Sequence, residues 1–465
     1  MAHLGKNLRS SSLVLAGLLV GSVANMVGHQ NRETSIMWTL FAQQTTRRRI
    51  RAGGWLFLLT VVSLAPGAAS PVAAPTLVYV SNSSDPGAIS VICASDNRII
   101  DTIGFDTWAF GLAVSPEGDR LYVGNGLSDR ISVVEPITGT VLATIATADT
   151  PVSIVVSPDG DRVYAAVRDH PVMVIDAESL AVLATVPVGQ APEYVAISSD
   201  GSLLVAANFR SHDVSVIDTA TNAVVATVPV GLYPAALAFA PGGPIAWVTA
   251  GGSLLISIID VAQGQLLRTI PTPGPWPAGV VFLPDGSRAY VAILAANQVS
   301  VFDVPGEVLL TTIPVGQYPT FPAVSPDGTR VFVPNRGSDS VSVIDTAMNT
   351  VVSTIAVSDG PLEAVTAPAP PPQGGIAILI DRIGDLMDGG DLSSGLANSL
   401  VVKLQNATKL LTDSIERNDV AAMNAILAFI NEVQGLVNGG WLTQAQGRPL
   451  IDAAGAIADR ILAIC

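Results

Sequence analysis

The sequence is poor in the residues that support metal, haem or thiol chemistry. It contains two cysteines and four histidines in 465 residues, and only His170 and His212 lie beyond residue 70. We find no C-x-x-C-H haem motif, no H-E-x-x-H zinc motif, no EF-hand spacing and no G-x-S-x-G elbow. The carboxylates in DGGDLSSG (residues 388–395) suit a turn between helices better than a calcium loop. We therefore expect no cofactor and no bound metal.

Basic residues are also scarce. The chain has 23 Lys and Arg against 38 Asp and Glu, and seven of the basic residues fall in residues 1–70. The remainder carries 16 basic and 37 acidic residues, a formal charge of −21. Such a field repels phosphate backbones, so we expect no nucleic-acid partner, and its simplest role is to keep an exported protein soluble.

Too few cysteines are present for a disulfide framework. Cys93 lies in the first repeat described below, and Cys465 is the last residue. A bond between them is one alternative, but no sequence feature brings them together. We predict two independent thiols.

What the sequence does contain is a repeated phrase. VSVID and its variants end at residues 93, 135, 176, 218, 260, 303 and 345, which are 42, 41, 42, 42, 43 and 42 residues apart. Seven copies at a nearly constant period indicate a repeat array.

Each copy predicts four short strands. An apolar run is followed by a Pro-Gly turn such as SPDG (residues 157–160), a second strand, the VSVID strand, an Asp-initiated turn and a fourth strand. Val, Ile and Tyr with period-two alternation favour strands over helices. The fold class predicted is a seven-bladed, all-β propeller over residues 76–367.

The two ends of the array predict ring closure. The first copy begins at Thr76 with what is already a second strand. The missing innermost strand is supplied by EAVTAP (residues 363–368), after the seventh copy. Closure of this kind leaves only short, protected edges.

The repeats resemble a known family. YVSN at residue 79, YVGN at residue 122 and VPNRGSDSVSVIDT at residue 333 are similar to the YVTN-type repeats of bacterial and archaeal surface and secreted propellers. The resemblance implies the propeller fold. Related propellers include lactone hydrolases, haem-bearing chains and binding proteins, so it does not select a function.

The N-terminal region predicts export. RRRIR (residues 47–51) precedes the apolar run WLFLLTVVSLA (residues 55–65) and the small residues PGAAS. This is the order of a secretory signal. We assign residues 37–70 as a signal peptide starting at Met37, and residues 1–36 as upstream sequence from a misplaced start. A double-spanning anchor is the alternative.

After the propeller, a Pro-rich linker (368–374) leads to helical periodicity over residues 375–465. We predict four antiparallel helices at 376–388, 396–418, 420–438 and 443–464. Asp419 is the predicted N-cap of the third, Gly439 and Gly440 end it, and Thr443 with Gln446 forms a capping box for the fourth.

This tail resembles the FIMAH module of secreted bacterial proteins, on LVVKLQNA at residue 400, AILAFINEVQ at residue 425 and LTQAQGRPLIDAA at residue 442. The resemblance implies an accessory or attachment role and no catalytic residues.

Charged side chains gather in two successive repeats. The connections between second and third strands, and between fourth and first strands, open on one face of a propeller, here called the top face. We predict a ligand-binding rim there, formed by Arg168, Asp169, His170, Glu193, Tyr194, Asn208, Arg210, His212 and Asp213. The alternative is an ordinary solvated rim. The aromatic residues Phe110, Tyr233, Trp276, Tyr318 and Phe321 are expected near the same face, as stacking groups or as a channel plug.

Three functions are compatible with these features. The first is a secreted or cell-surface binding or scaffold protein that recognises a protein or glycan. The second is a lactonase-like hydrolase using the His170 and His212 rim, and the third is a redox propeller, which the missing haem motif disfavours. Small residues on the predicted innermost strands favour binding over catalysis. We expect a monomer with no stable membrane span once the leader is removed.

Overall fold

The structure is a computed structural model that describes residues 76–105, 107–412 and 416–462. The predicted signal peptide, the residues before Met37 and Cys465 lie outside the described residues.

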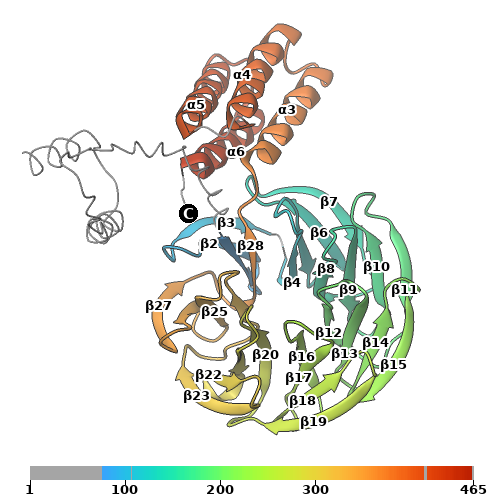
Figure 1. Cartoon of the computed structure of the whole chain (residues 1–465). Coiled ribbons are helices and arrows are strands. Elements are labelled where there is room, and N and C mark those ends of the chain that lie inside the picture. Colours follow the sequence, from blue (N-terminus) through green and yellow to red (C-terminus); the bar gives the residue numbers. More distant parts are fainter. Residues whose placement is uncertain (1–75, 106, 413–415, 463–465) are drawn as a thin grey trace, which may run out of the picture. The chain divides into compact units, whose positions relative to one another are not determined.

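Seven four-stranded antiparallel sheets occupy the described residues before the helices, and Figure 1 shows them arranged as the blades of a ring. The predicted seven-bladed propeller is confirmed. From the innermost to the outermost strand, the blades are: blade 1, β28 (Pro361–Pro368), β1 (Thr76–Asn82), β2 (Ala88–Cys93) and β3 (Ile99–Gly104); blade 2, β4 (Ala109–Val114), β5 (Leu121–Asn125), β6 (Arg130–Glu135) and β7 (Thr140–Ala146); blade 3, β8 (Pro151–Val156), β9 (Arg162–Val167), β10 (Val172–Asp176) and β11 (Val182–Val186); blade 4, β12 (Pro192–Ile197), β13 (Leu203–Asn208), β14 (Asp213–Asp218) and β15 (Ala223–Pro229); blade 5, β16 (Pro234–Phe239), β17 (Ile245–Ala250), β18 (Leu255–Asp260) and β19 (Gln265–Pro271); blade 6, β20 (Pro277–Phe282), β21 (Arg288–Ile293), β22 (Gln298–Asp303) and β23 (Val308–Pro314); and blade 7, β24 (Ala323–Val324), β25 (Arg330–Asn335), β26 (Ser340–Asp345) and β27 (Thr350–Ala356).

The ring closes as predicted, through a strand from the far end of the repeat array. β28 pairs antiparallel with β1, with Tyr79 opposite Val365. A parallel bridge between Phe321 and Glu363 joins blade 7 to blade 1. In that bridge, the Ala364 amide donates to the Phe321 carbonyl at 3.0 Å. The first and last blades are therefore tied together by backbone hydrogen bonds.

The repeated Ser, Asp and Gly residues stabilise the turns, as the sequence predicts. In blade 4, the Ser198 hydroxyl donates to Asp200 at 2.6 Å and Gly201 takes the left-handed φ of 74° that closes the turn. At the same end of this blade, Asp218 accepts the Thr221 amide at 2.8 Å. Asx-type turns of this kind fix the hairpins without long-range contacts.

A second repeated pair holds strands 2 and 3 together. The Asn that ends the second strand donates through Nδ2 to the Ser of the VSVID strand. These contacts are Asn125 to Ser132 at 2.8 Å, Asn208 to Ser215 at 3.0 Å and Asn335 to Ser342 at 2.9 Å. The Asn of the YVxN motif thus donates a buried hydrogen bond to the Ser of the VSVID motif, which explains why the two motifs recur together.

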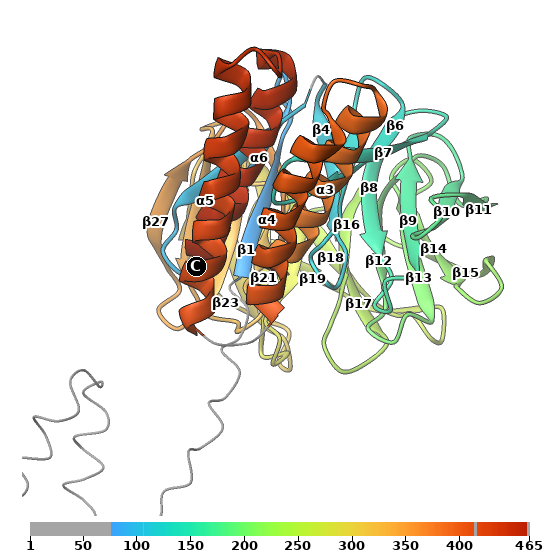
Figure 2. The same cartoon turned by 90° about the horizontal axis from the view of Figure 1, so that it is seen from above.

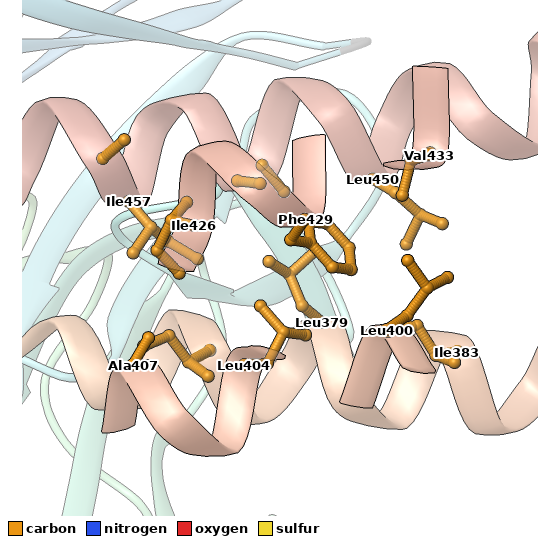
Figure 3. Close-up of a cluster of buried hydrophobic side chains, with 14 of the residues drawn as sticks. Leu379, Ile383, Leu400, Leu404, Ala407, Ile426, Phe429, Val433, Leu450 and Ile457 are labelled. Atoms are coloured by element: carbon orange, nitrogen blue, oxygen red, sulfur yellow. The ribbon is translucent and has the colours of Figure 1, made fainter. Parts of the chain in front are cut away.

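Four helices follow the propeller: α3 (Pro372–Asp388), α4 (Ser394–Thr412), α5 (Glu416–Asn438) and α6 (Gln444–Leu462). The four lie side by side in Figure 2, and α3 contacts both α4 and α6. Apolar residues at helical spacing form a common core, of which Figure 3 shows Leu379, Leu400, Phe429 and Leu450. The predicted helical bundle is confirmed.

The bundle is itself a twofold repeat with a period of 50 residues. Leu379 and Leu400 in the first helix pair are matched by Phe429 and Leu450 in the second, and all four are almost fully buried. The turn is repeated as well, because Gly390 and Gly440 have φ values of 81° and 75°. The module is therefore two copies of one helical hairpin packed together.

The predicted helix ends are partly right. The Thr443–Gln446 capping box is present, with the Gln446 Oε1 accepting the Thr443 amide at 2.8 Å. The predicted N-cap at Asp419 is wrong, because α5 already begins at Glu416. Asp419 instead lies within α5.

The prediction of two independent thiols is also wrong. Cys93 is disulfide-bonded, and the part of the chain that the structure describes contains no free cysteine.

Candidate functional site

The axis of the propeller is lined by one residue from each innermost strand. The register of each blade places Gly111, Ser153, Tyr194, Ala236, Gly279, Phe321 and Glu363 at equivalent positions. Four of these residues are glycine, alanine or serine. The space that they leave is taken by the three large ones, which come from blades 4, 7 and 1.

Tyr194, Phe321 and Glu363 meet across the axis. The rings of Tyr194 and Phe321 stack with centroids 5.5 Å apart. The Tyr194 hydroxyl donates to Glu363 Oε1 at 3.4 Å. Since Tyr194 belongs to blade 4 and its two partners to blades 7 and 1, these contacts plug the channel. We call these three residues the axial plug.

Glu363 is the carboxylic acid of this plug. The Glu363 residue is only 6% exposed, and its Oε2 accepts a hydrogen bond from the Leu112 amide at 2.9 Å. Burial raises the pKa of the Glu363 carboxyl to about 8, although the Leu112 and Tyr194 hydrogen bonds oppose that rise. The carboxyl is therefore protonated at neutral pH, because a charged carboxylate is costly in a site with little solvent.

Three residues of the predicted rim, Asp169, His170 and Arg210, lie together on the top face between blades 3 and 4. Arg210 lies in the loop after β13, and Asp169 lies in the loop after β9. Arg210 Nη1 donates to both carboxylate oxygens of Asp169, at 2.8 Å to Oδ1 and 3.0 Å to Oδ2. An open groove of about 320 Å³ lies beside this pair. It is lined by Asp169, His170, Pro171, residues 187–191 and Arg210. We call this the rim groove.

A second ion pair lies next to the rim groove. Arg168 Nε is 4.0 Å from Glu193 Oε1. Burial raises the pKa of the Glu193 carboxyl, and the charge of Arg168 opposes the rise. Glu193 is adjacent in sequence to Tyr194, so β12 connects the rim to the axial plug.

Three other predicted site residues have scaffold contacts. Asn208 is fully buried and forms the repeated Asn–Ser contact. Asp213 Oδ1 accepts from Asn208 Nδ2 at 2.7 Å. His212 Nδ1 accepts the Tyr233 amide at 3.1 Å, as Asn297 Oδ1 accepts the Tyr318 amide at 2.9 Å two blades later. His212 thus occupies a repeat position at which the side chain accepts a backbone amide from the loop that leads into the next blade.

The structure adds Glu363 to the candidate residues, and it places Phe321, an expected top-face aromatic, against Tyr194. Sequence reasoning used residues 363–368 only as a closing strand, and it did not connect Glu363 with Tyr194. The aligned repeats do contain a signal for Glu363. It is the one carboxylate at this repeat position, where five other innermost strands have Gly, Ala, Ser or Phe.

Metal and membrane features are limited. Within the described ranges, no cluster of three or more His, Cys, Asp or Glu residues is suited to hold a metal ion. One segment there, Asp419–Asn438, is long and apolar enough to span a membrane. It lies in α5, whose Ile426, Phe429 and Val433 are fully buried in the bundle, and a core helix meets the same criteria.

Comparison with known proteins places the propeller in a family. The model of the YNCE-like beta-propeller family matches residues 56–371, more than half of the chain. The chain belongs to the YNCE-like beta-propeller family. No curated protein matches the sequence.

Solved structures share this fold at low identity. Kuenenia stuttgartiensis hydrazine synthase has a TM-score of 0.52 and 23% identity, covering 56% of this chain and 90% of that one. A functionally unknown protein from Desulfotomaculum acetoxidans DSM 771 has a TM-score of 0.55 and 18% identity, covering 63% of this chain and 99% of that one. At these identities the likeness is one of fold alone.

Proposed function

We propose that this YNCE-like propeller is an exported binding protein that recognises a protein or glycan on its top face. The observation that carries this proposal is the rim groove, where Asp169, His170 and Arg210 from two successive blades line one cavity. The corresponding loops of blades 5 and 6 contain no charged residue at all, as in GGSL (251–254) and LAAN (294–297). Binding surfaces of repeat proteins commonly form where repeats depart from their consensus.

The axial plug supports a ligand site on the face. Because Tyr194, Phe321 and Glu363 meet at the axis, a ligand has more room at the open groove than in the channel. The Arg210–Asp169 pair offers both a donor fork and carboxylate oxygens, so a polar ligand can exchange these contacts for its own.

We do not favour the hydrolase alternative. A hydrolase needs a base that a second group orients next to an electrophile-stabilising donor. His212 Nδ1 already accepts the Tyr233 amide, and Asp169 is engaged by Arg210. These contacts engage two of the acid–base candidates of the rim, His212 and Asp169, with other partners.

Export is part of the proposal. The signal-like segment at residues 37–70 motivates it, and the disulfide-bonded Cys93 supports it, because disulfides persist in oxidising compartments. In this proposal the helical module at residues 375–465 is a FIMAH-like accessory domain, and the mature protein is a monomer without a membrane span. N-terminal sequencing of the native secreted chain tests the cleavage site near Ala69.

The groove is tested by variants of its charged residues. The native chain is screened against cell-envelope glycans, lactones and secreted proteins, and the Kd of each hit is measured for Arg210→Ala and Asp169→Ala. Arg336→Ala is a matched control, because Arg336 begins the equivalent loop of blade 7. We expect a loss of about tenfold or more in the groove variants, as for an exposed charged contact that the bound ligand covers. An equal loss in Arg336→Ala, or none in any variant, contradicts the proposed site.

A further inference from the structure

Three large aromatic side chains are exposed on the top face, in loops other than those that line the rim groove. Tyr233, Trp276 and Tyr318 occupy the same position in three successive blades, immediately before the proline that leads into the innermost strand. Their exposed fractions are 39%, 45% and 51%. The equivalent residues of blades 3 and 4, Thr150 and Ala191, are small and buried.

The backbone holds these rings in place. All three residues have left-handed φ values, 57°, 58° and 53°. This conformation costs a non-glycine residue on the order of 1 kcal/mol or more, so the surrounding loops must impose it. For two of the three residues, the contacts are the Tyr233 amide on His212 and the Tyr318 amide on Asn297.

Each ring also lies against bare backbone. A Cβ added at Gly252 would lie 2.5 Å from Tyr233 Cδ2, one at Gly251 would lie 2.5 Å from Trp276 Cε3, and one at Gly337 would lie 2.4 Å from Tyr318 Cδ2. Any larger residue in these loops would displace the ring. The glycines therefore support one side of each ring, while the exposed area remains available to a ligand.

The loops that carry and join the three rings are uncharged, whereas the flanking loops place His212 beside Tyr233 and Arg336 beside Tyr318. Residues 230–233, 251–254, 272–276, 294–297 and 315–318 include no Asp, Glu, Lys, Arg or His, although residues 71–465 carry a formal charge of −21. The loops offer neutral hydrogen-bonding side chains instead, among them Ser253, Asn297 and Gln317. Aromatic surfaces with a few well-placed polar groups are typical of small-molecule and sugar sites.

We propose that Tyr233, Trp276 and Tyr318 form a stacking platform for an uncharged glycan chain. A sugar ring has an apolar C–H face that fits a flat aromatic ring, and its hydroxyls suit amide and hydroxyl partners. Three supported rings on consecutive blades match an extended chain better than a single sugar. The loops between the rings offer no cation to an acidic glycan, which the acidic chain would also repel. This inference rests on the proposed binding function but concerns other loops than the rim groove.

A protein partner is the competing occupant, since exposed Leu232 and Leu254 lie in the same loops. Protein interfaces likewise combine aromatic residues with few charges. The glycine supports and the polar side chains between the rings favour the glycan.

The test uses the full mature chain and three soluble neutral polysaccharides: laminarin, mixed-linkage β-glucan and amylose. Polygalacturonate is the acidic comparison. Affinity is measured by affinity electrophoresis and calorimetry. We expect Trp276→Ala to weaken binding of a neutral polysaccharide by about tenfold, the size of a lost stacking contact. Trp276→Phe should retain most of the affinity. Leu310→Ala, at a 49% exposed residue of outer strand β23, should change nothing.

Three results would overturn the platform. They are failure of all three neutral polysaccharides to bind at millimolar concentration, preference for polygalacturonate, and unchanged affinity in a Tyr233→Ala, Trp276→Ala, Tyr318→Ala triple variant. Loss of binding in Arg210→Ala with full binding in the triple variant would overturn the platform while supporting the rim groove. A partner protein that binds these rings when no neutral polysaccharide does would also overturn the glycan assignment.

Discussion

The Tyr194 hydroxyl lies 3.4 Å from Glu363 Oε1, although the two residues belong to blades 4 and 1. This contact crosses the axis of the propeller, and it joins the strand that closes the ring to a blade far from the closure. Glu363 simultaneously accepts the Leu112 amide of blade 2. One carboxyl thus links three blades, and its protonation state bears on the stability of the whole ring.

Glu363→Gln should make the stability of the protein less dependent on pH. The carboxyl has a pKa of about 8 in the folded protein and 4.5 without perturbation. Between these values the folded state holds a proton that the unfolded state has lost, so the contribution of Glu363 to stability falls as pH rises. Each pKa unit corresponds to about 1.4 kcal/mol, so the change over the window is a few kcal/mol.

Urea unfolding at pH 5, 6, 7 and 8 measures this effect. Gln keeps an acceptor for Leu112 and a polar group for Tyr194. The free energy of unfolding of the variant should therefore increase relative to that of wild type as pH rises. Glu117→Gln, at an exposed residue of the β4–β5 turn, is the control. Parallel stability curves for wild type and Glu363→Gln would show that Glu363 does not titrate in this range.

The blades were predictable from sequence because their determinants are local. The Asp218 turn, the Ser198–Asp200 contact and the Asn208–Ser215 pair each involve residues fewer than ten positions apart, and they recur with the repeat. Ring closure was predictable as well, since Thr76 begins with a second strand and only residues 363–368 could supply the first.

The site was only partly predictable because it depends on contacts between distant blades. Asp169 and Arg210 were expected on one rim and do meet there. Tyr194 was expected at the mouth, but its contacts with Phe321 and Glu363 span 127 and 169 residues of sequence. The scaffold tasks of Asn208 and His212 became evident only when their equivalents, such as Asn335 and Asn297, were seen in the same contacts.

Removing β28 should destabilise the propeller sharply. Without this strand, β1 loses its antiparallel partner and Phe321 loses its bridge to Glu363, which exposes an edge. Two truncated chains, ending at Gly360 and at Pro371, differ only in β28 and the short segment after it. We expect the shorter chain to melt at least about 10 °C lower, or to aggregate. Equal melting temperatures would mean that β28 does not close the ring.

Reduction should lower the stability of the mature chain. Cys93 is disulfide-bonded, and loss of a native disulfide typically costs about 2–5 kcal/mol. Thermal melts with and without reductant measure the change in stability. A colorimetric thiol assay counts the free thiols before reduction. Cys93→Ser should melt like the reduced wild type and show no further shift with reductant. A wild-type melting temperature that reductant leaves unchanged would contradict this prediction.

His212 separates a scaffold role from a ligand-binding role. Its Nδ1 accepts the Tyr233 amide, and Asn297 performs the same task for Tyr318. His212→Asn should therefore keep nearly wild-type stability, because Asn supplies an acceptor in a position where the repeat already uses one. His212→Ala should cost about 0.5–1.5 kcal/mol, the net contribution of one hydrogen bond, since it leaves the exposed Tyr233 amide without this partner. Urea unfolding of both variants measures the difference. In ligand assays, His212→Asn should bind as wild type, whereas Arg210→Ala should not. If His212→Asn is stable but has lost the ligand, His212 contacts the ligand directly and belongs to the rim site.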